Sequence, residues 1–339
     1  MLLKIIVQTI QILLLLIPLA LPARTITDMA KRKVEIPDKL ERILPYDFKT
    51  NLLLFPFAGN RMIAKAISLR ESLTADDYRY IHPEWKKMKE IDCRNIEEVL
   101  KMKPQAIVVG SFVDDGSAIE TYEAFARKAH IPLIVVDLEL MNLDKTMLFL
   151  GELLDKPDEA KACADFLRKV LNETAKMTAT PARRRVYMAN GSNGLRTAPN
   201  TSNHAELFEK MRLENVARSA LNAQGFAEVS IEQIMQWNPE YIFCVGKGET
   251  NPYRAIYKSA LWRTIAATRQ KQVYFVPTEP FLWFDMPPSI NRIPGLIWFS
   301  QLFYGVSEDA AKEKIRTFYR LFYRYELTDK DWQNLFKWS

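Results

Sequence analysis

The sequence predicts an α/β protein of two lobes, each with a mostly parallel sheet flanked by helices, joined by one long rigid connecting helix. Two observations lead to this fold class. Short β-branched runs alternate with amphipathic helical stretches along the chain, and a single longer helical pattern separates an earlier set of such runs from a later one. The 339 residues, 48% of them hydrophobic, suit roughly two domains of about 150 residues each.

The predicted strands are short runs rich in Val, Ile, Leu and Tyr. In the first half they cover residues 43–44, 106–110 and 133–137, and in the second half residues 186–188, 241–245 and 273–276. Helical stretches separate consecutive runs, so neighbouring strands are expected to pair in parallel, with helices covering the sheets.

The connecting helix is expected to begin at Pro157, because proline suits the first turn of a helix, and to continue to about Lys176. It lies in a helical segment, residues 144–180, between an N-terminal lobe at 24–143 and a C-terminal lobe at 181–339. Its apolar residues fall on one face: Ala160, Cys163, Ala164, Leu167, Val170 and Leu171.

The first 23 residues have the pattern of a secretory signal peptide cut after Ala23. Lys4 precedes an apolar run over residues 10–21, and a small residue closes the segment. A membrane anchor is the alternative, but the unbroken apolar core is shorter than the roughly 20 residues of a spanning helix. No cysteine follows the cut site, which argues against a lipid anchor. A periplasmic location after cleavage is therefore expected.

Composition and missing motifs exclude several function classes. The net charge of +6 is spread among interspersed acids and bases, and the run at residues 183–185 is interpreted as a solvated loop rather than a nucleic-acid site. The sequence has no GxGxxG, P-loop, HExxH, CxxC or GxSxG pattern, so no catalytic residue, cofactor or metal site is predicted. The three cysteines are expected to be buried, with at most one pair bridged. The three histidines are interpreted as structural.

Residues 95–109 and 230–244 form an internal repeat: a cap residue, a short helix, a proline and a strand. Asn95 with Glu98, and Ser230 with Gln233, have the spacing of a capping box. Glu97 and Glu232 are not needed for the box, yet they occupy the same place in each half. Either they favour the helix N-terminus electrostatically, by about 0.3–1 kcal/mol, or they are exposed acidic groups for a partner with two-fold symmetry.

Several phrases together resemble the periplasmic substrate-binding proteins of the cobalamin and ferric-siderophore class, which serve ABC importers. They are the opening at residues 26–37 with 42–44, the two Ile-Glu phrases of the repeat, and the Glu-Asn-Val-Ala run at 214–217. Lys31 replaces the usual glycine of the opening. The resemblance implies that Glu97 and Glu232 dock on arginine pockets of an ABC permease dimer in the inner membrane. It also implies that the long helix limits lobe closure; a monomer is expected.

A ligand is expected in the cleft between the lobes, because ligands of open α/β sheets bind beyond the carboxyl ends of the strands. The loops at 46–50, 111–116, 190–197, 247 and 281–292 occupy those positions. The alternatives are core packing for the aromatic residues and ordinary surface positions for the arginines. The candidate ligand-binding residues are Trp283, Phe284, Asp285, Arg292, Arg196 and Tyr46.

The leading hypothesis is capture of an iron chelate, a siderophore or haem-like complex, and its delivery to the permease. The preference for iron rests on how often the resembled family serves it. A corrinoid or a metal oxyanion such as molybdate is the alternative ligand for the same role. A periplasmic sensor without a transport role is another alternative, and an enzyme is the least favoured class because no nucleophile or metal-cluster motif is present.

Overall fold

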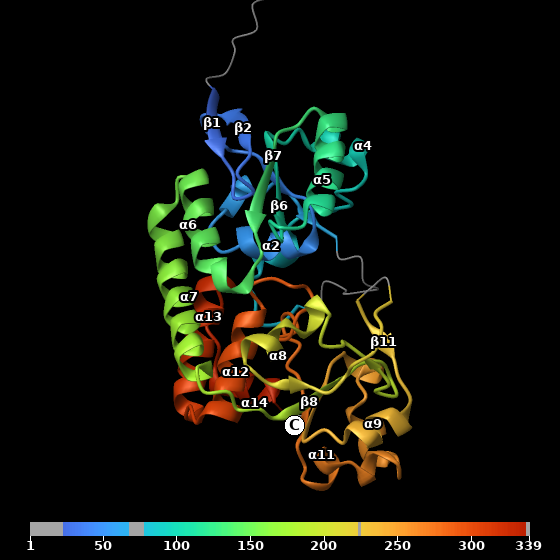
Figure 1. Cartoon of the computed structure of the whole chain (residues 1–339). Coiled ribbons are helices and arrows are strands. Elements are labelled where there is room, and N and C mark those ends of the chain that lie inside the picture. Colours follow the sequence, from blue (N-terminus) through green and yellow to red (C-terminus); the bar gives the residue numbers. More distant parts are fainter. Residues whose placement is uncertain (1–22, 68–77, 223–224, 337–339) are drawn as a thin grey trace, which may run out of the picture.

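The computed structural model describes residues 23–67, 78–222 and 225–336, and its arrangement is the predicted two-lobed α/β fold (Figure 1). The predicted signal peptide lies outside these residues, apart from Ala23. Within the described ranges, no helix combines the length and apolar character needed to cross a membrane. The lobe boundaries after residues 143 and 180 stay predictions.

The first lobe and the two helices that follow it contain these elements: β1 (Ala23–Thr27), β2 (Lys33–Pro37), β3 (Ile43–Pro45), α2 (Phe48–Leu54), η1 (Gly59–Arg61), β4 (Lys65–Ala66), α3 (Glu84–Lys87), β5 (Glu90–Ile91), α4 (Ile96–Met102), β6 (Ala106–Ser111), α5 (Gly116–Ala129), β7 (Leu133–Asp137), η3 (Leu140–Asn142), α6 (Leu143–Leu153) and α7 (Pro157–Thr178).

The second lobe contains β8 (Arg185–Ala189), β9 (Arg196–Thr197), η4 (Asn203–Ala205), α8 (Glu206–Lys210), β10 (Glu214–Asn215), β11 (Ala227–Glu228), α9 (Ile231–Trp237), β12 (Tyr241–Cys244), η5 (Gly248–Thr250), α10 (Tyr253–Lys258), η6 (Trp262–Thr264), α11 (Ala266–Arg269), β13 (Val273–Phe275), α12 (Arg292–Tyr304), α13 (Glu308–Phe322) and α14 (Asp329–Leu335).

The central sheets are parallel, as the alternation of strands and helices predicts. In the first lobe the strand order is β3-β6-β7, with Val108 opposite Ile134. In the second lobe it is β10-β8-β12-β13, with Phe243 opposite Met188 on one side and Tyr274 on the other. Antiparallel pairing is confined, among the named strands, to β1-β2 and β11-β9. All the carboxyl ends of the central strands in each lobe therefore share one edge.

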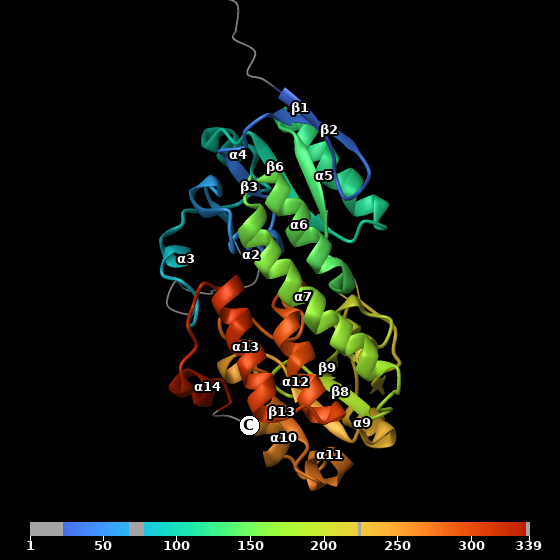
Figure 2. The same ribbon diagram turned by 90° about the vertical axis from the view of Figure 1, so that its left-hand side faces the viewer.

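The long helix α7 runs beside both lobes (Figures 1 and 2). Its 22 residues correspond to about 33 Å at 1.5 Å per residue. It packs against α6 on the first-lobe side and against α12 and α13 on the second-lobe side. The predicted apolar face is buried in full, including Cys163 and Leu167, and Pro157 occupies the first turn.

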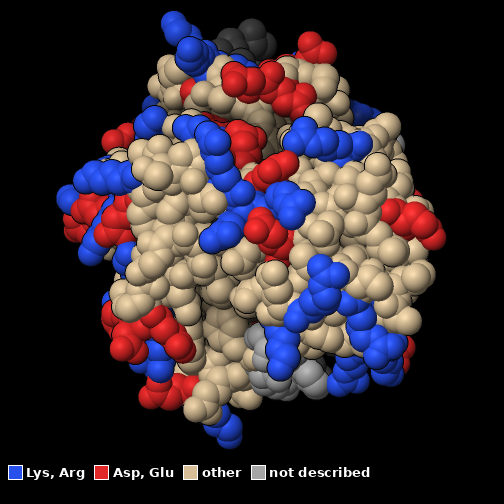
Figure 3. Space-filling model, turned by 60° about the horizontal axis from the view of Figure 1, so that its bottom comes forward, with Lys and Arg blue, Asp and Glu red and all other residues tan. Residues whose placement is uncertain are grey.

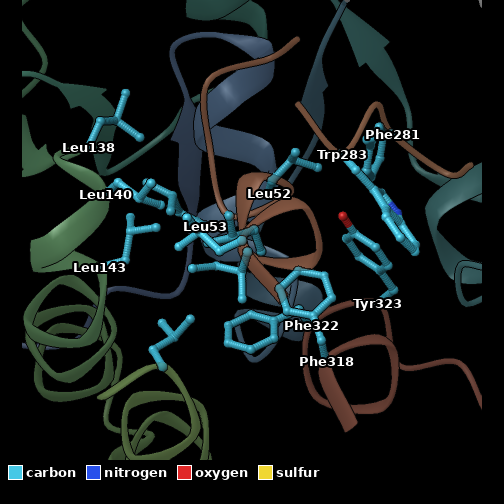
Figure 4. Close-up of a cluster of buried hydrophobic side chains, with 14 of the residues drawn as sticks. Leu52, Leu53, Leu138, Leu140, Leu143, Phe281, Trp283, Phe318, Phe322 and Tyr323 are labelled. Atoms are coloured by element: carbon cyan, nitrogen blue, oxygen red, sulfur yellow. The ribbon is translucent and has the colours of Figure 1, made fainter. Parts of the chain in front are cut away.

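One buried hydrophobic cluster extends through both lobes, so the lobes are not separated by solvent at their junction. Figure 4 shows leucines of the first lobe and aromatic residues of the second lobe in this cluster. The cluster includes Leu52, Leu53, Leu138, Leu140, Phe281, Phe318 and Phe322. Separating the lobes would expose this shared apolar surface to water, at about 25 cal/mol per Å².

Surface charge and cysteine chemistry follow the sequence expectation. On the face drawn in Figure 3, Lys and Arg side chains are intermixed with Asp and Glu side chains. Cys93, Cys163 and Cys244 are all buried and free. Burial raises the pKa of Cys93 and of Cys163 to about 12, so both thiols stay protonated at neutral pH.

Close packing of α6 on α7 gives a stability prediction at Gly151. A Cβ atom added there would lie 2.2 Å from the Cβ of Ala160, and both positions belong to the backbone contact between the two helices. Gly151→Ala is expected to lower the free energy of unfolding by about 1–3 kcal/mol, the usual cost of overpacking. Urea unfolding followed by tryptophan fluorescence measures the change.

The matched control is Gly116→Ala in α5, where an added Cβ meets nothing within 4 Å. Alanine at this position is expected to leave stability unchanged or to raise it slightly. Equal unfolding midpoints for the Gly151 and Gly116 variants would contradict the close contact of α6 with α7.

Candidate functional site

A cavity of about 610 Å³ lies between the lobes, beyond the carboxyl ends of β3, β4 and β5 on one side and of β12 and β13 on the other. This is the position that the strand order predicts for a ligand. Loops 46–50 and 281–292 and Lys247 contribute to its wall as expected, whereas loops 111–116 and 190–197 are not among its described lining residues. Those lining residues are Tyr46, Asp47, Phe48, Lys49, Ala66, Ile67, Asp92, Cys93, Arg94, Tyr122, His204, Gly246, Lys247, Thr250, Thr278, Pro280, Phe281, Leu282, Met286, Pro287 and Pro288.

Aromatic rings from both lobes meet at the wall of the cavity. Phe48, in the first turn of α2, packs edge-on against Phe281, with ring centroids 5.7 Å apart. Behind them, Trp85 and Tyr78 contact the same two rings and complete a buried aromatic cluster. The cavity therefore has an apolar, aromatic stretch of wall made jointly by the two lobes, which suits contact with apolar or aromatic ligand groups.

Lys49 is the partly buried cation on the first-lobe side. Its ammonium lies 2.7 Å from a carboxylate oxygen of Asp47 and 5.8 Å from the ring centroid of Tyr122. Burial by itself lowers the pKa of Lys49, but the attraction of Asp47 and Tyr122 outweighs burial and raises it above its ordinary value. Lys49 therefore remains charged at every physiological pH.

Tyr46 lies at the cavity wall, as predicted. Its ring packs edge-on against Tyr122 and Phe125, with centroids 4.9 and 5.3 Å away. Burial, followed by the proximity of Tyr122 and Asp47, raises the pKa of its phenol. At neutral pH Tyr46 therefore keeps its hydroxyl proton, which it can donate to an acceptor on a ligand.

Two further cations stand at the cavity, one from each lobe. Arg94 binds Asp92 through two N–H···O hydrogen bonds of 2.9 Å each, and more than half of its side chain is exposed. Lys247, in the loop after β12, lies 3.3 Å from Glu279. The wall thus carries Lys49 and Arg94 on one side and Lys247 on the other, and each cation has a carboxylate neighbour: Asp47, Asp92 and Glu279, respectively. These charges balance, so the three cations offer an anionic ligand charge-assisted N–H donors and not a net positive charge.

Asp285 does not face the cavity: its side chain is 2% exposed, and it pairs with Nδ1 of His204, which does line the cavity. The His204 ring also stacks on Phe226, with centroids 4.3 Å apart, and the Arg196 guanidinium lies 4.2 Å from the Phe226 centroid. Arg196 is not among the described lining residues either. The predicted residues Asp285 and Arg196 therefore reach the cavity only through His204 and Phe226.

Trp283 and Phe284 are corrected from wall residues to core residues. Both are buried, at 0% and 1% exposure, and Figure 4 places Trp283 within the shared hydrophobic cluster. The Trp283 indole N–H donates to the Tyr319 hydroxyl at 3.0 Å. The physical reason is that α8, α12 and α13 pack onto this loop, and their aromatic side chains enclose it.

The prediction that Arg292 binds ligand is also wrong, because Arg292 is buried, at 1% exposure, and its guanidinium contacts protein groups of both lobes. It forms an ion pair with Glu206 in the second lobe and donates to the carbonyl oxygen of Leu138 in the first, at 2.6 Å. A third hydrogen bond reaches the carbonyl of Ser289 at 3.0 Å. Burial lowers the pKa of Arg292 and raises that of Glu206, while each charge partly offsets the effect on the other.

The two repeated helices are capped by similar means. Ser230 accepts from the Gln233 backbone N–H while the Gln233 side chain accepts from the Ser230 N–H, so the predicted capping box of α9 is present. In α4, Asn95 caps the helix, but the Glu98 carboxylate accepts from the Asp92 N–H instead and the box stays open.

Glu97 and Glu232 are exposed at the second position of α4 and α9. Both helices lie on the side of the molecule opposite α7 (Figure 1). A hydrogen bond from its own backbone N–H and one from the Ser230 side chain lower the pKa of Glu232, so this carboxylate is ionised at neutral pH.

Sequence reasoning missed Phe48, Lys49 and Tyr122. The first two lie in the first turn of α2, within the segment 46–50 that was expected to face the cleft, and the position of Lys49 two residues after the helix cap Asp47 was the available signal. Tyr122 reaches the cavity from the middle of α5, which no local pattern indicates. Within the described ranges, no three His, Cys, Asp or Glu side chains form a group that could hold a metal ion.

Comparison with known proteins gives the class. Residues 65–280 match the family described as periplasmic binding protein. The molybdate-binding protein MolA of Haemophilus influenzae is 24% identical, covering 90% of this chain and 92% of its own. The structure of an ABC transporter solute binding protein from Sulfurospirillum deleyianum covers 93% of this chain and 99% of its own, at 24% identity and a TM-score of 0.81. The vitamin B12 binding protein BtuF of Vibrio cholerae covers 81% and 98%, at 17% identity and a TM-score of 0.57.

The family match covers well over half of the chain, and the chain belongs to the periplasmic binding protein family. The resemblance seen in the sequence is confirmed at the level of this family, and the fold is that of the two solved binding proteins.

The buried ion pair at the lobe junction gives a prediction about stability. Arg292→Met and Glu206→Leu are each expected to cost about 3–5 kcal/mol, because either change leaves the buried charge of the other residue without its partner. The double variant Arg292→Met with Glu206→Leu is expected to cost less than the sum of the single changes. Urea unfolding of all three proteins supplies the comparison, and strictly additive losses would show that the two side chains are not coupled.

Proposed function

We propose that this protein captures a ferric chelate, a siderophore or haem-like complex, in the cavity between its lobes and delivers it to an ABC permease dimer. The observation that carries the proposal is the make-up of the cavity: about 610 Å³, with Phe48 and Phe281 as an aromatic surface and Lys49 and Lys247 on opposite sides. This volume is in the usual range for ligands of drug size. Ammonium groups favour ligands with net negative charge, and ring faces favour planar chelating groups.

Molybdate is the second candidate, supported by the name of the H. influenzae relative that aligns over most of the chain. The hydroxyl of Tyr46 and the charged groups of Lys49 and Arg94 could bind a small oxyanion, because all three are donors close to one wall. The large remaining volume weighs against a four-oxygen anion as the sole occupant. A corrinoid is the third ligand to be tested.

Ligand identity is tested on the mature protein purified mildly from the periplasm. Native mass spectrometry and an absorption spectrum of the same sample identify a bound species: a charge-transfer band with iron, a Soret band or corrin bands. Titration calorimetry then compares a ferric catecholate, ferrichrome, haem, cyanocobalamin and sodium molybdate. Tight binding of molybdate alone would refute the ferric-chelate proposal, and failure of every ligand would favour the sensor alternative.

The role of Lys49 gives a quantitative prediction. Lys49→Met removes a charge-assisted hydrogen bond and leaves Asp47 without its cation, so affinity for an anionic ferric chelate is expected to fall 10- to 100-fold, equivalent to about 1.5–3 kcal/mol. Affinity for cyanocobalamin, which has no net charge, is expected to change little. Calorimetric titration of the mature variant provides both values.

Lys145→Met is the matched control, because Lys145 is exposed on α6 and bonds to Asn142, away from the described cavity wall. The control is expected to bind as the unchanged protein does. An equal loss in both variants would point to overall charge, and no loss in Lys49→Met would remove Lys49 from the site.

Docking through the repeated helices is the second part of the proposal. Glu97→Gln and Glu232→Gln are each expected to weaken binding to the permease at least tenfold, and the double variant is expected to abolish ligand uptake, because loss of one member of a docked charge pair costs about 2–5 kcal/mol. Ligand affinity is expected to stay unchanged. Glu120→Gln and Glu313→Gln, exposed acids on α5 and α13, serve as controls. Uptake by the double variant equal to that of the two controls would contradict the docking role.

A further inference from the structure

The second feature shared by α4 and α9 is an exposed apolar side chain one turn after each exposed glutamate. Large hydrophobic residues with more than a third of their surface exposed are few among the described residues: Leu100 at 48%, Leu221 at 41%, Met235 at 37% and Leu261 at 48%. Two of these four, Leu100 and Met235, occupy the same position of the internal repeat. Glu97 precedes Leu100 by three residues, and Glu232 precedes Met235 by three.

Helix geometry places each acid and its apolar neighbour on the same face, because side chains three residues apart are adjacent on a helix surface. Val99 directly precedes Leu100, and Ile234 directly precedes Met235. Both are buried, at 0% exposure, and anchor the two helices to their lobes in the same orientation. Each helix then ends in a left-handed residue, Lys103 or Asn238, and leads into an internal strand of its sheet.

A single exposed leucine is normal on a protein surface. The same pair of an acid and an apolar residue at matched positions of two lobes is not accounted for in this way and calls for an explanation. Neither apolar side chain is required by the capping of its helix, since Asn95 and Ser230 provide the caps. Methionine and leucine bury well in an apolar pocket, and methionine adapts to the shape of that pocket. A partner with two equivalent subunits would meet the same pair of groups twice.

We infer that Leu100 and Met235 are apolar anchors of the permease-docking surface, and that the permease subunits each offer an apolar pocket beside a cationic one. The inference rests on the proposed function, because it takes the permease dimer as the partner. The acids set orientation and approach, and burial of the two apolar side chains supplies affinity that salt does not screen. The docking surface is thus defined by four side chains, Glu97, Leu100, Glu232 and Met235.

Photocrosslinking of the full-length protein in cells of its own organism tests the surface directly. The photoreactive residue p-benzoylphenylalanine replaces Leu100, Met235 or, as the control of similar exposure outside both helices, Leu221. Crosslinks from positions 100 and 235 are expected to contain peptides of the membrane-spanning subunit of one ABC permease, with none from position 221. Crosslinks to a second copy of this chain, to another protein or to nothing at both positions would overturn the inference.

Binding to that permease, reconstituted in nanodiscs, separates the anchors from the charges. The Leu100→Ala and Met235→Ala double variant is expected to bind at least tenfold more weakly at both low and high salt, with unchanged ligand affinity and unfolding midpoint. If only Glu97→Gln with Glu232→Gln weakens binding, the anchor role is wrong and the docking proposal survives. If neither double variant weakens binding, both the anchor inference and the docking proposal are wrong. Leu221→Ala is the control and is expected to bind normally.

Discussion

The contact on which the two-lobed arrangement depends is the buried guanidinium of Arg292. It pairs with Glu206 in the second lobe and donates to the Leu138 carbonyl in the first, within a hydrophobic cluster that both lobes share. The hydroxyl of Ser289 adds a second link by donating to the Lys49 carbonyl at 2.8 Å. Polar groups buried together in this way are costly to separate, because each would lose its partner before it regained water. The lobes are therefore held at a nearly fixed separation, with α7 alongside.

A fixed separation explains how the cavity is built. Its walls come from strand ends of two different lobes, and Phe48 meets Phe281 across the boundary. The residue next to Phe48 is Lys49, whose carbonyl is held by Ser289, so the junction also positions the first-lobe cation. A cavity assembled before ligand arrives loses less entropy on binding, since little of the wall must be ordered. The same rigidity would keep α4 and α9 at constant spacing, as the proposed docking on a permease dimer requires.

Local patterns gave correct predictions wherever the structure is determined by short-range physics. The strands, the Pro157 start of α7, its apolar face and the Ser230 capping box follow from periodicity and from hydrogen bonds within four residues. The capping of α4 already departs from the pattern, because Glu98 finds a competing donor in the Asp92 N–H. That donor is near in sequence, but its position depends on the preceding turn. Strand direction alone predicted five cleft loops: 46–50, 247 and 281–292 contribute to the cavity wall, whereas 111–116 and 190–197 are not among its described lining residues.

By itself the sequence determined the fold class, the parallel sheets, the connecting helix and the family. Tertiary structure decided which residues of the 281–292 loop line the cavity. Trp283 and Arg292 are residue types that are common in binding loops. Whether their side chains are exposed or buried depends on whether another element covers them. The sequence carried one signal, because residues 293–299 of α12 include no polar side chain and a helix that is apolar all round must be enclosed by partners. In the structure, residues 292–300 are all buried. The segments that enclose α12 are chosen by long-range packing. The sequence around a residue does not show which distant residues it will contact in the folded chain.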